Sequence, residues 1–440
     1  MGVALARQIA VSPNTNFHYG YLIGAVILSL GPSVTVLIGT LAFSEPIGLL
    51  LFRDVKYTQV CIATLTGALG YSFYVVLYSF YRGRNLMPLA NLWTLATIVV
   101  LPTILVCSLA KGGDVFTLVM ALYSPTFLSA VPLIVYLIIA ISRYRPFLCV
   151  KVRLLELLGY GLPRVPSGLA LAALFALGSI LAPYQGTIRD AGYLAPGQAC
   201  LGLAESALGA FGIVVLPWAS HLFVTGKAST LRERIADTVI LVIQLCGYLA
   251  LHLIVWSDFL ISVWLGSQFG DAVMPTRIVL LGLVPYMMFV MLRSFLDAVE
   301  KRPMITYALI VAFGSGLVSS LLLSSIIPGV RGLAIGLTLG ISVLGILTLH
   351  YLWRHGWLTS LPYSVIGEAA LLNAMFLLLS IGFRIWASSM FQSNVEGALG
   401  ICTEIILFLI YLVLLYRLRT RWILETLARI SMGPVYLSSK

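Results

Sequence analysis

Ionisable side chains within apolar runs are the residues of this sequence best suited to chemistry. Arg164 lies about ten residues into the apolar segment 154–182, and Glu205 lies near the middle of the segment 192–224. A charge at the centre of a bilayer costs at least ~2.5–3.5 kcal/mol, so such a residue faces a partner, a cavity or a pathway. We therefore treat Arg164 and Glu205 as candidates for binding a polar or anionic ligand.

The two candidates can meet if their segments form a hairpin. They lie 23 and 18 residues from Thr187, and this difference of five residues corresponds to roughly 7.5 Å along a helix. A long arginine side chain spans that distance. The pair is then either a structural ion pair that holds the hairpin together or part of a cavity wall, and the sequence leaves both interpretations open.

A second set of candidates lies in two other apolar segments. Arg293 and Asp297 are one helical turn apart and share a face, where a pair at the membrane surface is favoured over a ligand contact. Tyr78 belongs to a stripe of tyrosines at helical spacing, which either packs against a neighbouring helix or stacks on sugar rings. The stripe comprises Tyr71, Tyr74, Tyr78 and Tyr81.

The remaining ionisable residues within apolar segments favour structural roles. Arg384 and Glu404 lie in the last two segments and are interpreted as structural or interfacial. His252 is a single histidine in its segment, which favours a hydrogen-bonded core residue over a proton carrier. His350 and His355 lie at a segment end beside a tryptophan and an arginine, which is typical of a solvated membrane interface.

No motif in the sequence predicts catalysis. The sequence has no glycine-rich phosphate loop, no cluster of metal ligands and no nucleophile with a base at a defined spacing. The six cysteines are scattered singly and are interpreted as small apolar fillers. They are Cys61, Cys107, Cys149, Cys200, Cys246 and Cys402. We therefore expect a protein without enzymatic activity, cofactor or metal.

The composition indicates the class of protein that positions these residues. Hydrophobic residues make up 60% of the 440 residues and charged residues 10%, and the mean hydropathy is +1.02. An average soluble domain has roughly 25% charged residues. The sequence therefore predicts an all-α, polytopic transmembrane helix bundle. At roughly 20 apolar residues per span, about 12 transmembrane helices fit.

Twelve apolar segments follow one another along the chain, and none of the connections is long enough for a separate soluble domain. The connections on one side, together with both termini, hold eighteen of the twenty-seven basic residues, and the opposite side holds six. This bias predicts that both termini are cytoplasmic. The same bias explains most of the net charge of +11. Anionic lipids at the cytoplasmic face are the expected partners of these basic residues, and no nucleic-acid partner is expected. The segments are 20–43, 59–81, 90–110, 115–142, 154–182, 192–224, 235–265, 273–298, 303–327, 331–353, 365–391 and 398–416.

The stretch GYGLPRVPSG, Gly159 to Gly168, is the most irregular of the apolar regions. It carries two prolines and an arginine into a long apolar run. A membrane helix tolerates this, because neighbouring helices satisfy the backbone groups that proline frees. Irregular backbone with a charge at membrane depth usually marks a pathway or a binding cavity.

The chain also contains a weak internal repeat. Tyr78–Pro88 aligns without gaps on Arg293–Pro303 at an offset of 215 residues, and Ser44–Asp54 lies opposite Ser257–Ser267 at an offset of 213. Two independent pairs with nearly the same offset predict two lobes related by a six-helix repeat in the same orientation, facing each other about an axis along the membrane normal.

Several phrases resemble the Wzx-type polysaccharide (O-antigen) flippases, members of the superfamily that also contains the MATE drug exporters and the lipid II flippase. Gly159–Gly168, Asp190–Leu203 and Val214–Leu222 resemble the family's seventh and eighth helices. Tyr78–Gly83 and Leu292–Pro303 resemble the ends of its fourth and tenth helices. The similarity extends over nearly the whole chain, through short motifs set in apolar sequence.

The resemblance implies a function and a division of the chain. The family's lobes enclose a cavity through which an undecaprenyl-linked oligosaccharide passes from the cytoplasmic to the periplasmic leaflet of the bacterial inner membrane, for O-antigen, capsule or exopolysaccharide synthesis. Residues 1–150 would form an N-terminal lobe of four helices, 151–358 a lobe of six, and 359–440 an additional helix pair and a cytoplasmic tail. Polysaccharide polymerase or ligase proteins would be partners.

The resemblance also implies roles for the candidate residues. Arg164 would contact the pyrophosphate or an acidic sugar of the substrate. The full set of expected substrate-binding residues is Arg164, Glu205, Arg293, Asp297 and Tyr78.

One departure from the family concerns the start of the chain. Only four apolar segments precede the counterpart of the family's seventh helix, where six are expected, so the first two helices have no counterpart. The start GVALARQIA resembles the cytoplasmic end of the family's second helix. We expect either a longer gene whose start lies upstream, which is favoured, or a shortened family member.

Three alternatives remain open. A small-molecule antiporter of the MATE kind would share the fold. A membrane polymerase or ligase of the same pathway would need a large periplasmic loop, whereas the longest connection on that side, Ser44 to Thr58, has about fifteen residues. A membrane protein without transport activity is the third alternative, because the predicted lobes are unequal.

Overall fold

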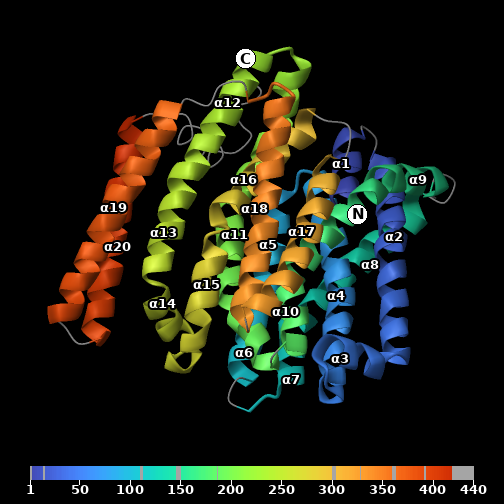
Figure 1. The fold of residues 1–440 in the computed structure, drawn as a ribbon. Helices are drawn as coiled ribbons and strands as arrows, with labels where there is room; N and C mark the ends of the chain where they lie inside the picture. Colours follow the sequence, from blue (N-terminus) through green and yellow to red (C-terminus); the bar gives the residue numbers. More distant parts are fainter. Residues whose placement is uncertain are drawn as a thin grey trace. The chain divides into compact units, whose positions relative to one another are not determined.

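The computed structural model of the chain describes residues 2–12, 15–109, 112–144, 150–185, 187–299, 304–327, 329–358, 363–390 and 393–418 (Figure 1). Every regular element in these ranges is a helix, and none is a strand. The predicted all-α fold class is therefore confirmed. The predicted cytoplasmic tail beyond Leu418 and the turn with Lys301 and Arg302 lie outside the described residues.

The chain divides into two compact units, Met1–Pro166 and Ser167–Lys440, and the division falls inside one helix. The three-part division predicted from the sequence, with its boundaries at residues 150 and 358, stays a prediction. Each unit is described separately below.

The first unit is organised around one long helix, α4, which packs against α1, α2, α3, α5 and α7. A β-carbon at Gly67 would lie only 2.5 Å from the ring of Tyr123, and one at Gly70 only 2.7 Å from Phe127. These glycines therefore let the α7–α8 region approach the α4 backbone, as small residues do in membrane helices. The helices are α1 (Gly2–Val11), α2 (Thr15–Ala42), α3 (Ser44–Phe52), α4 (Thr58–Gly83), α5 (Met87–Thr94), α6 (Leu101–Leu109), α7 (Val115–Tyr123), α8 (Ala130–Tyr144) and α9 (Val150–Gly161).

The second unit is organised around α16, which is buried over most of its length and packs against α11 and α18. Helices α17 and α18 also pack closely, because a β-carbon at Gly336 would lie 2.6 Å from the Cα atom of Ser320. The helices of this unit begin with α10 (Val165–Gln185), α11 (Ile188–Val224), α12 (Ala228–Leu241), α13 (Gly247–Val255) and α14 (Ser257–Trp264). They continue with α15 (Val273–Leu280), α16 (Leu283–Val299), α17 (Met304–Ile326), α18 (Val330–Arg354), α19 (Tyr363–Met390) and α20 (Ser393–Leu418).

The last two helices dock on a π-helical turn, Val242–Cys246, that joins α12 to α13. Such a turn disturbs the regular pattern of backbone hydrogen bonds, and in an apolar environment other groups satisfy the carbonyls. Asn373 of α19 donates to the Ile243 carbonyl at 3.3 Å, and Tyr411 of α20 donates to the Gln244 carbonyl at 2.8 Å. The irregular turn therefore gives the C-terminal helix pair a specific place to bind.

Nine helices in the described ranges are long and apolar enough to cross a membrane, or ten if the bent pair Ser267–Leu280 and Leu283–Val299 forms one span. These ten match ten of the twelve predicted segments. The other two predicted segments, 192–224 and 398–416, fall on α11 and α20. The chain is thus a multi-pass membrane protein.

One pair of segments of the predicted repeat has matching local structure. Ser44–Asp54 falls on the short helix α3, and its partner Ser257–Ser267 falls on the short helix α14. In the other pair, Pro88 lies in the first turn of α5, and its counterpart Pro303 lies outside the described residues. The symmetry between lobes stays a prediction.

Candidate functional site

The structure brings two of the predicted site residues, Glu205 and Arg293, together between α11 and α16. The Arg293 Nη2 atom lies 3.5 Å from Oε1 of Glu205. The Tyr286 hydroxyl donates to the other carboxylate oxygen, Oε2. Tyr286 and Arg293 are seven residues apart on α16, so two helical turns place both on one face. We call these three residues the α11–α16 cluster.

The α11–α16 cluster is half open, with one wall made of aromatic rings. Tyr286 is 2% exposed, whereas the side chains of Glu205 and Arg293 are 33% and 36% exposed. Phe175 of α10 packs edge-on against Tyr286 at 5.3 Å, and the Arg293 guanidinium lies 5.6 Å over the ring of Phe289. The carboxylate is held by a buried hydroxyl, while the guanidinium has a long contact and an accessible surface. Such an arginine can bind an anion.

Tyr286 is the member of this cluster that sequence reasoning missed. Its signal was present, because it lies two turns from Arg293 in an otherwise apolar helix. Asp297, which was paired with Arg293 from the sequence, is an exposed residue of the same helix. Its role in substrate binding stays a prediction.

Arg164 lies in a 3₁₀ turn, Leu162–Arg164, between α9 and α10. Its Nη1 atom donates to the Tyr160 carbonyl at 3.1 Å, and its guanidinium lies 3.9 Å over the Tyr160 ring. The Arg7 guanidinium lies 4.4 Å from the centre of the same ring. Tyr160 thus gathers two cations through cation–π contacts. We call these residues the Tyr160 cluster.

The Tyr160 cluster was only partly visible in the sequence. Arg7 counted there only as a basic residue near the N-terminus, because it lies far along the chain from Arg164. Cations gathered on one ring can share an anion such as a phosphate. The predicted contact between Arg164 and Glu205 stays a prediction.

The tyrosine stripe on α4 is mostly a packed surface. Tyr74 and Tyr81 are 8% and 4% exposed, and the Tyr74 hydroxyl lies 2.8 Å from the Thr94 hydroxyl. Tyr78 stacks on Tyr74 at 5.8 Å, and Tyr71 is 48% exposed. Packing therefore accounts for Tyr74 and Tyr81, and a sugar contact remains a proposal for Tyr78.

A second cluster in the first unit escaped prediction. One guanidinium nitrogen of Arg153 lies 3.0 and 2.9 Å from the two carboxylate oxygens of Glu156 and 3.0 Å from the Tyr21 hydroxyl. The Tyr21 hydroxyl donates to Glu156, and the Phe17 ring lies 4.3 Å from the guanidinium. This α2–α9 cluster joins α2 to α9.

Two of the ionisable residues that were expected to be structural, His252 of α13 and Glu404 of α20, contact each other. His252 is buried and contacts Glu404, whose carboxylate also accepts hydrogen bonds from Trp256 and Ser380. His252 is thus a hydrogen-bonded core residue, as predicted. No group of three or more possible metal ligands occurs in the part of the chain that the structure describes.

Comparison with solved structures shows which known proteins have a similar fold. The structure is similar to the lipid II flippase MurJ in its inward closed conformation, with a TM-score of 0.68 and 14% identity over 95% of this chain and 88% of MurJ. It is also similar to an inward-facing multidrug resistance MATE family transporter of the MOP superfamily, with a TM-score of 0.65 and 18% identity over 83% of this chain and 86% of the transporter. The chain has the fold of these two kinds of transporter.

A eukaryotic MATE transporter shares the same fold, with a TM-score of 0.56 and 14% identity over 84% of both chains. No protein-family model matches the sequence, and no curated protein matches it. The similarity is therefore one of structure. It shows a fold that was expected from the sequence.

Proposed function

We propose that this protein is a flippase that moves an undecaprenyl-linked oligosaccharide from the cytoplasmic to the periplasmic leaflet of the bacterial inner membrane during surface polysaccharide synthesis. The observation that carries the proposal is the fold that this chain shares with MurJ over 95% of its length. MurJ is described as a lipid II flippase, and the name of its substrate indicates a lipid-linked molecule. Each MATE structure compared above covers a smaller share, 83% or 84%. The proposal includes a cytoplasmic location for both termini.

The accessible arginines fit the anionic part of such a substrate. A pyrophosphate link offers several oxygen acceptors, and guanidinium groups bind phosphate oxygens through paired hydrogen bonds. Arg164 and Arg7 present two cations around Tyr160 in the first unit. Arg293 presents a third cation in the second unit, where its 3.5 Å contact with Glu205 is long for an ion pair.

The α11–α16 cluster further supports a binding step in which Arg293 exchanges its internal partner, the Glu205 carboxylate, for an anion of the substrate. Glu205 keeps the hydrogen bond from Tyr286 when Arg293 turns away from it, so the carboxylate is not left without a donor. The guanidinium can then bind a phosphate without exposing an unsatisfied partner. Glu205, Arg293 and Tyr286 would thus act as a reversible anion-binding site. Arg164, Asp297 and Tyr78 complete the proposed set of substrate-binding residues.

Deletion of the gene tests the proposed function. We expect the loss of surface polysaccharide and the accumulation of lipid-linked units that face the cytoplasm. Expression of the full chain from a plasmid should restore export, whereas a MATE transporter should not. Unchanged export in a strain without a redundant flippase would contradict the proposal.

A drug antiporter of the MATE kind is the second candidate, because MATE structures share the fold. It predicts a different phenotype from the same deletion strain, namely increased sensitivity to several drugs with normal surface polysaccharide. Measuring both phenotypes in one strain separates the two functions.

A further inference from the structure

A crevice of about 350 Å³ opens in the second unit where α13 ends and α14 begins. Its walls come from α13, α15 and α19. Apolar side chains and two arginines line it together. The lining residues are Ile254, Val255, Arg277, Ile381, Arg384, Ile385 and Ser388.

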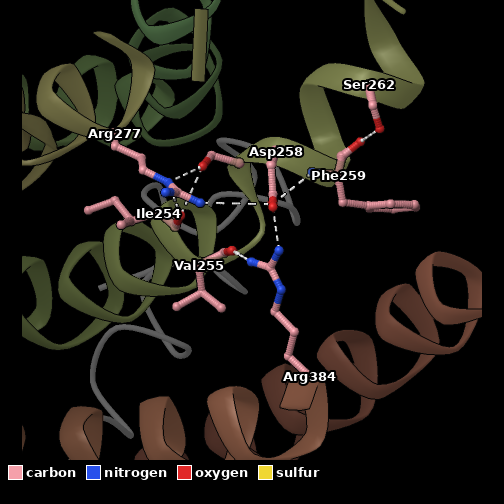
Figure 2. A network of polar contacts seen from close by, with 8 residues as sticks. Ile254, Val255, Asp258, Phe259, Ser262, Arg277 and Arg384 are labelled. Carbon is pink, nitrogen blue, oxygen red and sulfur yellow. Dashed lines mark hydrogen bonds and ion pairs between the residues drawn. The ribbon is translucent and has the colours of Figure 1, made fainter. Parts of the chain in front are cut away.

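The end of α13 fixes both arginines in place (Figure 2). The last carbonyls of a helix lack partners within it, and here guanidinium groups supply the donors. Arg277 donates from Nε to the Ile254 carbonyl at 3.2 Å and to the Ser257 hydroxyl at 2.7 Å. Arg384 donates to the Val255 carbonyl and to the carboxylate of Asp258. Both side chains are thus held at the crevice by the backbone of α13.

The charges around the crevice do not cancel. Arg277 lies 3.9 Å from Asp258, which also accepts from Arg384, so two guanidinium groups share one carboxylate. Among the described residues, Asp258 is the one carboxylate that forms an ion pair with either arginine. The arginine side chains are 34% and 28% exposed. One positive charge of the network therefore remains for a ligand, which matches a single phosphodiester.

The surroundings of the crevice indicate the chemistry of that ligand. Ile385 is 66% exposed and lies on α19 beside Arg384, so an apolar surface continues from the charged site. Trp264 of α14 and Trp386 of α19 are 56% and 49% exposed. Tryptophans are enriched at the level of the lipid head groups, so these two side chains favour a place for this end of α13 near the membrane interface. A ligand here meets cations and apolar side chains at once.

We propose that the crevice binds a membrane glycerophospholipid with an anionic head group. Its phosphodiester would lie between Arg277 and Arg384, and its acyl chains would pack along Ile381 and Ile385. The excess charge favours an anionic over a zwitterionic head group, and the apolar walls favour a lipid over free phosphate. The bound lipid would link α13 and α15 to α19. This site is separate from the transported substrate and does not rest on the proposed function.

Lipid binding to the purified, delipidated full-length protein tests the proposal. Native mass spectrometry is used to titrate phosphatidylglycerol and phosphatidylcholine under the same conditions. We expect phosphatidylglycerol to bind more tightly, and Arg277→Gln or Arg384→Gln to weaken its binding about tenfold, as the loss of a charged hydrogen bond predicts. Arg331→Gln, at an exposed position in the first turn of α18, is the matched control for general electrostatic attraction and should change binding less than about twofold.

Two further variants keep the test valid if an arginine variant is unstable. Ser388→Phe fills the crevice from an exposed position of α19 without removing a charge, and it should also abolish the preference for phosphatidylglycerol. Arg384→Lys should retain part of the binding, because a charge remains. Equal binding of the two lipids, equal losses in Arg331→Gln and Arg384→Gln, or full competition by millimolar inorganic phosphate would each overturn the proposal.

Discussion

The two units contain clusters of the same three residue types, a tyrosine, a glutamate and an arginine, with different consequences. In the α2–α9 cluster, Arg153 contacts both oxygens of Glu156 at 2.9 and 3.0 Å, and its side chain is 18% exposed. In the α11–α16 cluster, Arg293 contacts one oxygen of Glu205 at 3.5 Å, and its side chain is 36% exposed. The first geometry fastens two helices together. The second leaves a guanidinium that can bind another anion.

The source of this difference lies in how each cluster is placed on its helices. Arg153 and Glu156 are three residues apart on α9, so they meet in any helical conformation, and Tyr21 is added from α2. Arg293 and Glu205 lie on different helices, so their contact depends on how α11 and α16 pack. A relative shift of those helices changes the second pair and leaves the first intact. In these two clusters, the local pair on α9 therefore suits a fixed contact, and the pair between α11 and α16 suits a changing site.

Substitution of Arg293 and of Arg153 should give the largest difference in transport between the two clusters. Arg293→Ala removes a charged hydrogen-bond donor from the proposed substrate site, so we expect transport at matched membrane abundance to fall by about tenfold to a hundredfold. Arg153→Ala should instead leave transport per molecule within about threefold and lower Tm by about 1 °C, for a loss of about 1 kcal/mol in a chain of 440 residues. Transport is measured in vesicles with lipid-linked oligosaccharide, and Tm in detergent.

The opposite result would contradict the roles assigned to the two arginines. If Arg153→Ala abolished transport at normal Tm while Arg293→Ala had no effect, the accessible arginine would not be the functional one. Arg331→Ala on the exposed start of α18 serves as the control for loss of a surface cation.

The Tyr160 cluster gives the next largest effect. Arg164→Ala should impair transport several-fold more than Arg384→Ala at matched abundance, because Arg384 fastens α19 to the end of α13. Arg164→Lys should retain part of the activity if only its charge matters, and less if paired hydrogen bonds to phosphate are needed. The same vesicle assay measures all three variants. Equal, small effects of Arg164→Ala and Arg384→Ala would remove Arg164 from the site.

The fold was largely predictable from the sequence, because long apolar runs have few alternatives in a membrane. All twelve predicted segments fall on helices, and Pro88 opens α5 as expected. The 3₁₀ turn at Leu162–Arg164 falls within the stretch Gly159–Gly168, which was predicted to be irregular, whereas the π turn in the second unit was not predicted. Two carbonyls of the π turn at Val242–Cys246 accept hydrogen bonds from Asn373 and Tyr411, which are distant from the turn in sequence. Local patterns do not contain such contacts.

The candidate site was predictable as single residues but not as contacts. Glu205 and Arg293 stood out because a charge within an apolar helix is costly. Their partners did not stand out, since a tyrosine such as Tyr286 is an ordinary membrane residue until a carboxylate faces it. Arg153 and Arg7 were overlooked because they follow the positive-inside pattern, which already accounts for basic residues near segment ends.

The tyrosines of the two clusters should have smaller and opposite consequences. Tyr21→Phe removes a hydrogen bond within a fastened cluster, so we expect a fall in Tm corresponding to about 1 kcal/mol and unchanged transport. Tyr286→Phe removes the donor that holds Glu205, so Glu205 should pair more closely with Arg293 and compete with the substrate. Apparent substrate affinity should then fall several-fold. A higher affinity in Tyr286→Phe would contradict the proposed exchange.

The smallest expected effect concerns the dependence of stability on pH. It involves a carboxylate that belongs to neither cluster. Asp114 lies outside the spans and caps the start of α7, where its side chain accepts from the Thr117 N–H at 2.9 Å. Hydrogen bonds from the Thr117 hydroxyl and N–H lower the pKa of Asp114 below its ordinary value. Because the folded pKa is lower than the unfolded one, the stabilisation is complete above the unfolded pKa and is lost as the pH falls through the folded pKa.

We therefore expect a small decline in Tm below about pH 4 that depends on Asp114. Asp114→Asn should remove this decline with little change at neutral pH, since asparagine is also a good N-cap and does not titrate. Asp114→Ala should lower Tm slightly at neutral pH as well. An unchanged acid decline in Asp114→Asn would contradict this assignment to Asp114.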